Sequence, residues 1–287
     1  MLPLLNSLLA SIHDTDVLMS MNIIQFYAHL QESSLAPQIL AFLEPKIPQV
    51  MTNLSADADA FQSLLGAGTC EFLKSLSTHP QFKRLDSEYG ILKTLEVHVF
   101  NPASPQHVPA LIAFSNIAST DGIFASISPE SLEAYKKLMS TRPITPEKLT
   151  ALGIVLSNNH DAEESNIRAK WFTLSLSDLV TPYIHDPTLQ LSPITLLSAL
   201  AGHLWGVRII AASSVIMEWL MDRSGDYQEA TGKFAVMKRM LQTAVAVEGP
   251  HHDHRGAMGQ WRSHAEIFVS RGEWWRDNVA EVATQGS

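Results

Sequence analysis

Histidine and carboxylate side chains gather in one short stretch near the end of the sequence. The residues His251, His252, Asp253 and His254 follow one another directly. Imidazole and carboxylate ligands together suit ions such as zinc, iron and manganese. The pattern therefore predicts a divalent-metal site at these four residues. The alternative is a solvated, histidine-rich loop between two helices.

A row of carboxylates at helical spacing forms a second candidate metal site. Glu218, Asp222 and Asp226 stand at positions i, i+4 and i+8. A helix that continued through Gly225 would project all three from one side. Like charges at this spacing repel unless protons, arginines or divalent cations intervene, so Glu218 and Asp222 are further candidate metal ligands. The alternative is that Ser224 and Gly225 end the helix at Asp222, leaving Asp226 in the first turn of the next helix.

The spacing of Glu218, Asp222 and Asp226 resembles the second metal motif of class I terpene cyclases. In that family three oxygen ligands at i, i+4 and i+8 hold magnesium against a diphosphate. The resemblance therefore implies magnesium-assisted cyclisation. It covers only residues 218–229, Glu218 and Asp222 stand where the family has Asn and Ser, and no aspartate-rich DDxxD motif lies upstream.

Titratable residues interrupt an otherwise apolar run over residues 192–222. Between its first and last apolar residues, only His203, Arg208 and Glu218 can titrate. A helix that is apolar on all sides is expected to be buried, and a buried polar group needs a partner. We therefore predict a buried central helix, with His203 as a catalytic acid–base group and Arg208 as an anchor for a substrate carbonyl or anion. The alternative is structural, a core histidine bonded to a carbonyl and an arginine paired with a carboxylate.

Helix start signals recur along the chain and predict an all-α fold. Ser128-Pro129, Thr145-Pro146 and Ser192-Pro193 each place a hydroxyl at the N-cap and a proline at the first helical position. Apolar residues then recur at helical spacing, and no run alternates with the period of a strand. The best strand candidate is residues 266–270. We predict a compact multi-helix bundle around the buried helix 192–222.

The distribution of residue types favours two helical halves, residues 1–125 and 126–287, although a single domain also fits. All six tryptophans fall in the second half. No internal repeat is visible at the period of helical-repeat proteins.

Charge and cysteine content exclude several classes of partner. The net charge is −9 and no basic stripe is visible, which argues against nucleic acid and against anionic membranes. A single cysteine, Cys70, cannot form an internal disulfide, and we expect it to fill a helix interior. The amino terminus lacks the positive region of a signal peptide. These features predict a cytoplasmic protein.

Together these features favour an enzyme that acts on a small apolar or aromatic substrate in an interhelical cavity. The predicted reaction is metal-assisted oxygenation or cyclisation in specialised metabolism, with Fe, Mn, Zn or Mg as cofactor. Two alternatives stay open. One is a metal-free cyclase, including a divergent enzyme similar to class I terpene cyclases. The other is a non-catalytic helical binding or adaptor module. A homodimer is compatible with each of these hypotheses.

Overall fold

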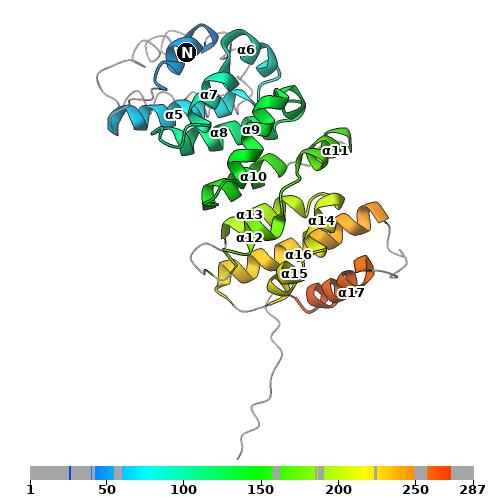
Figure 1. Ribbon diagram of the computed structural model, residues 1–287. Coiled ribbons are helices and arrows are strands. Elements are labelled where there is room, and N and C mark those ends of the chain that lie inside the picture. The colour runs from blue at the N-terminus through cyan, green and yellow to red at the C-terminus, as the bar shows by residue number, and fades with distance from the viewer. Residues whose placement is uncertain are drawn as a thin grey trace, which may run out of the picture. The chain divides into compact units, whose positions relative to one another are not determined.

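The computed structural model describes residues 26, 40, 43–54, 60–157, 162–184, 186, 191–222, 225–248 and 257–272. Every regular element in these ranges is a helix (Figure 1), which confirms the all-α prediction. Residues 266–270, the best strand candidate, belong to a helix. The chain divides into two compact units, Met1–Leu174 (unit 1) and Ser175–Ser287 (unit 2). A division at residue 125 stays a prediction from composition.

The described helices of the two units follow one another along the chain. Those of unit 1 are η2 (Glu44–Lys46), α4 (Ile47–Met51), α5 (Ala60–Leu76), α6 (Phe82–Tyr89), α7 (Ile91–Val99), α8 (His107–Ser119), η3 (Phe124–Ser126), α9 (Pro129–Ser140), α10 (Pro146–Leu156) and α11 (Ala162–Trp171). Those of unit 2 are α12 (Leu176–Val180), α13 (Leu191–Leu200), α14 (Leu204–Ala211), α15 (Ser214–Met221), α16 (Tyr227–Glu248) and α17 (Ala257–Ser270).

Local capping signals set the starts of two of these helices as predicted. The hydroxyl of Ser128 accepts the backbone N–H of Ser131 at 3.1 Å at the start of α9. The hydroxyl of Thr145 accepts the N–H of Lys148 at 3.4 Å at the start of α10. The third predicted N-cap, Ser192, is wrong, because α13 begins at Leu191 and therefore includes Ser192.

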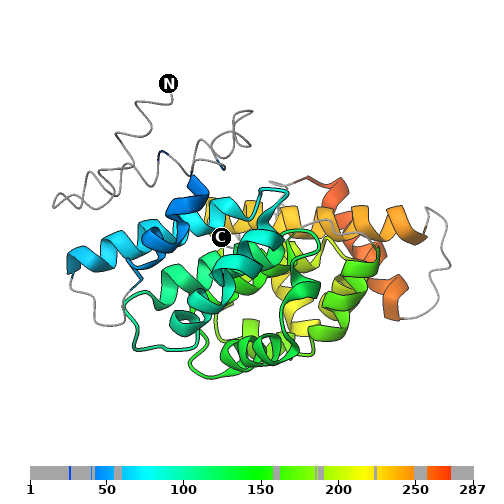
Figure 2. The ribbon, with the colours of Figure 1, turned by 90° about the horizontal axis from the view of Figure 1, so that it is seen from above.

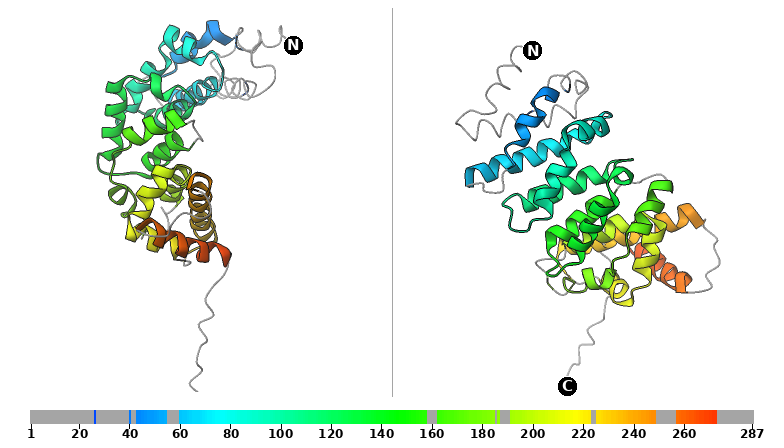
Figure 3. Two further views of the ribbon diagram at one scale, coloured as in Figure 1. Left: turned by 90° about the vertical axis from the view of Figure 1, so that its right-hand side faces the viewer. Right: turned by 45° about the horizontal axis from the view of Figure 1, so that its top comes forward.

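Unit 1 is a stack of helices in which α8 lies at the centre. α8 packs against α5, α7 and α10, and most of its side chains are buried. α5, α8 and α10 begin at residues 60, 107 and 146, which are 47 and 39 residues apart. Figure 3 shows these three helices following one another in the stack. This spacing and order are typical of helical-repeat proteins, whose repeats can share geometry without visible sequence similarity.

Unit 2 is organised around α16, which packs against α13, α14, α15 and α17. Figure 2 shows α16 in gold with α17 in orange and red beside it. The predicted single helix over residues 192–222 is wrong, because this stretch forms α13, α14 and α15. Each of these short helices buries a different set of its apolar residues, so the stretch reads as apolar on all sides without being one helix.

The break between α13 and α14 depends on a close backbone approach at Gly206. A Cβ atom at this position would overlap the carbonyl oxygen of Leu200, at the end of α13. Since that oxygen belongs to the backbone, it cannot move aside cheaply. In the described part of the chain no single helix is long and apolar enough to cross a membrane, and α14 and α15 meet that criterion only as a pair bent by 94°.

We predict that Gly206→Ala lowers the free energy of unfolding by about 1–3 kcal/mol, the usual cost of forcing extra volume into a packed site. Gly202→Ala is the matched control in the same unit, because the nearest atoms to its Cβ would be those of the guanidinium at the end of the flexible Arg239 side chain. Urea unfolding followed by circular dichroism measures both variants. Equal losses in the two variants would contradict the role of the Leu200 carbonyl.

Two histidines of unit 1 are buried, and burial opposes their protonation. His79 and His98 are 8% and 3% exposed. The ring Nδ1 of His79 accepts the N–H of Gln81 at 3.2 Å, and the ring Nδ1 of His98 lies 2.9 Å from the hydroxyl of Ser104. Burial lowers the pKa of both imidazoles, and for His79 the nearby charge of Arg84 lowers it further.

Because the folded pKa of each histidine is below the unfolded value of about 6.5, the unfolded chain binds more protons in mild acid. The contribution of the two neutral imidazoles to the free energy of unfolding is complete above that unfolded value. It is lost as the pH falls through the folded pKa. We expect the urea concentration at the midpoint of unfolding to be lower at pH 5.5 than at pH 7.5. In the double variant His79→Asn, His98→Asn this decrease should be smaller, and an unchanged decrease would show that other groups cause it.

Candidate functional site

The structure places the two predicted catalytic residues differently from expectation. His203 is the N-cap residue of α14, is 6% exposed, and stacks on the indole of Trp205 with ring centroids 5.4 Å apart. Arg208 was expected in a buried helix, but its side chain is exposed on α14. The two residues therefore differ in burial, one in the core and one on the surface.

The carboxylate row is broken between α15 and α16. α15 ends at Met221, and Asp222 follows it with extended backbone. The side chain of Asp226 accepts the N–H of Glu229 at 2.8 Å, as an N-terminal cap of α16. Glu218 and Asp222 are both exposed. The resemblance to the terpene-cyclase metal motif therefore lacks the continuous helix that it needs, and the simpler interpretation of two helix ends is correct.

The remaining candidate metal ligands, His251, His252, Asp253 and His254, lie outside the described residues. Within the described ranges no group of three or more His, Cys, Asp or Glu side chains could hold a metal ion. A metal site that includes Glu218 and Asp222 has no third ligand there.

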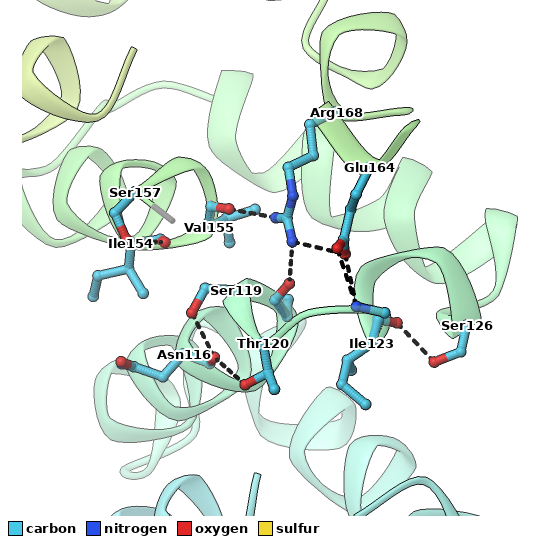
Figure 4. Close-up of polar contacts among 12 residues, drawn as sticks. Asn116, Ser119, Thr120, Ile123, Ser126, Ile154, Val155, Ser157, Glu164 and Arg168 are labelled. Atoms are coloured by element: carbon cyan, nitrogen blue, oxygen red, sulfur yellow. Dashed lines mark hydrogen bonds and ion pairs between the residues drawn. The ribbon is translucent and has the colours of Figure 1, made fainter. Parts of the chain in front are cut away.

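The charged residues that the fold does bury were not predicted as a group. Arg168 on α11 is fully buried and lies at the ends of two other helices (Figure 4). Its guanidinium donates to the carbonyl oxygen of Val155 in the last turn of α10 and, at 3.0 Å, to that of Ala118 in the last turn of α8. A cation is favourable at a helix C-terminus, where carbonyl groups lack helical partners.

Glu164 completes this junction from the preceding turn of α11. Its carboxylate pairs with Arg168 at 3.3 Å and accepts the N–H of Gly122 at 3.0 and 3.1 Å. Gly122 has a φ of 71° in the turn after α8, a conformation that favours glycine. Burial lowers the pKa of Arg168 to about 10, while the charge of Glu164 opposes this shift. The guanidinium therefore stays protonated at neutral pH.

A second buried cation, in unit 2, also pairs with an acid one turn earlier and binds a carbonyl group at the end of another helix. Lys233 is 1% exposed and forms an ion pair with Glu229 one turn earlier on α16. Its ammonium donates to the carbonyl oxygen of Asp222, directly after α15, at 3.3 Å. It also lies 4.8 Å from the ring centroid of Trp219, a favourable cation–π distance.

Lys148 also binds backbone carbonyl groups, in the segment that follows α9. Its ammonium donates to the carbonyl oxygens of Thr141 at 2.7 Å and Pro143 at 3.0 Å. Burial lowers the pKa of this lysine. Arg168, Lys233 and Lys148 each bind backbone carbonyl groups that follow or end a helix, which is a structural role. A run of apolar residues interrupted by a basic residue does not identify such groups, because their partners lie elsewhere in the sequence.

Five uncharged residues of unit 1 lie at helical spacing on the outer faces of two packed helices, and we call them the neutral stripe. It consists of residues at helical spacing that are exposed or half-buried: Val108, Ile112 and Asn116 on α8, with Thr150 and Ile154 on α10. In Figure 4, Asn116 and Ile154 lie on the same side of the α8–α10 pair. Charged residues border the stripe: exposed Glu147 lies on the same face of α10, two turns before Ile154, and the exposed positions of α9 include Glu130, Glu133 and Lys137. Charged residues are depleted at the centres of protein interfaces.

In the described residues, the fold is all-helical and its buried cations bind carbonyl groups at the ends of neighbouring helices. A family model described as a proteasome non-ATPase 26S subunit matches residues 1–253. Because the match covers most of the chain, the protein belongs to this family. No curated protein sequence matches the chain.

Membership of this family corrects the predicted function. The family is described as a proteasome non-ATPase 26S subunit, so the predictions of an oxygenase or cyclase, of specialised metabolism and of a small apolar substrate are wrong. The buried cations agree with the correction, since each is bound to backbone carbonyl groups. The alternative of a non-catalytic helical module fits the family better.

We predict that Arg168→Ala lowers the free energy of unfolding by about 3–5 kcal/mol, because it leaves Glu164 buried without its charged partner. Arg168→Lys should also be destabilising, since a single ammonium cannot reproduce the planar fork that contacts two carbonyl groups. Arg84→Ala is the control, because Arg84 pairs with Glu44 on the surface and exposed pairs contribute little. Chemical denaturation compares the three variants. A loss for Arg84→Ala as large as that for Arg168→Ala would contradict the structural role of the buried junction.

Metal binding at His251, His252, Asp253 and His254 stays a prediction. If these residues hold zinc, iron or manganese, tag-free protein purified without chelator should contain near-stoichiometric metal by elemental mass spectrometry. A variant with alanine at all four positions should lose it. An empty wild-type protein would show that the cluster is a histidine-rich loop.

Proposed function

We propose that this protein is a non-catalytic helical subunit that binds other proteins of the 26S proteasome. The observation that carries the proposal is the family match over residues 1–253. The stacked helices of unit 1 support it, because stacked helical repeats present extended faces on which other proteins dock. A cytosolic or nuclear location, where proteasomes act, follows from the same proposal.

Within this function, the neutral stripe is the surface that we propose for a partner subunit. Val108 is 43% exposed, although it is a large apolar residue. Its neighbours on the stripe, Ile112, Asn116 and Ile154, add apolar area and an amide without any charge. Removing these five residues from water needs no desolvation of charged groups, which is the costly step in forming an interface. A partner surface that is itself uncharged and apolar is the chemistry that fits.

Affinity purification from cells that express the tagged protein tests the proposal. We expect subunits of the 26S proteasome to be enriched with the wild-type protein relative to a tag-only control, as quantified by mass spectrometry. Ile112→Glu and Ile154→Glu should lower this enrichment at least about tenfold, because each places a charge in the proposed contact.

Val97→Glu is the matched control, since Val97 is an apolar residue of unit 1 that is 63% exposed and lies on α7, outside the stripe. It should keep wild-type enrichment, and circular dichroism should show equal helicity in all three variants. Absence of proteasome subunits from the wild-type purification would overturn the proposed function. Equal enrichment in all variants would leave the function in place and overturn the role of the stripe.

A further inference from the structure

We draw no further inference here: the strongest candidate, the turn between α13 and α14 where His203 stacks on Trp205 and the guanidinium of Arg239 lies against Gly202, is a half-buried surface patch, and nothing in the structure shows what covers it.

Discussion

A buried cation at the end of a helix is the interaction on which both units depend. Arg168 joins α11 to the last turns of α8 and α10 and is held in place by Glu164. Short helices leave many carbonyl groups without helical partners, and in a stack of short helices several of these ends are far from water. A positive side chain that donates to them satisfies the carbonyl groups and interacts favourably with the helix dipole.

The need to satisfy these carbonyl groups explains why the cations are buried. Removing an ammonium or guanidinium group from water is costly, and the lowered pKa values of Arg168 and Lys148 reflect that cost. In each case the cation binds two or more acceptors, which offsets the loss of water. The acids one turn away, Glu164 and Glu229, neutralise two of these cations. Charged residues in an apolar environment therefore connect helices in this protein, although in isolation they suggest a catalytic site.

Connected short helices suit the role in protein binding that we propose for this chain. In unit 1, α8 lies between α5 and α10, so each added helix extends the surface of the stack. The neutral stripe crosses two of these helices, and its residues come from positions about forty residues apart in the sequence. Membership of the proteasome non-ATPase subunit family agrees with this organisation. The interhelical pocket and the metal-assisted reaction were inferred from residue types alone, and residue types do not reveal which groups are neighbours.

The sequence by itself determined the features that depend on a few adjacent residues. Ser128-Pro129 and Thr145-Pro146 begin helices because their hydroxyl groups and prolines act within one turn, and Cys70 is buried in a helix interior as expected, with its pKa raised by burial to about 12. Tertiary structure decided the rest. Residues 192–222 break between α13 and α14, where Gly206 lets α14 meet the end of α13, and Arg168 acquires its role from carbonyl groups 13 and 50 residues away. Such contacts depend on packing between distant segments, which the pattern of a single helix does not contain.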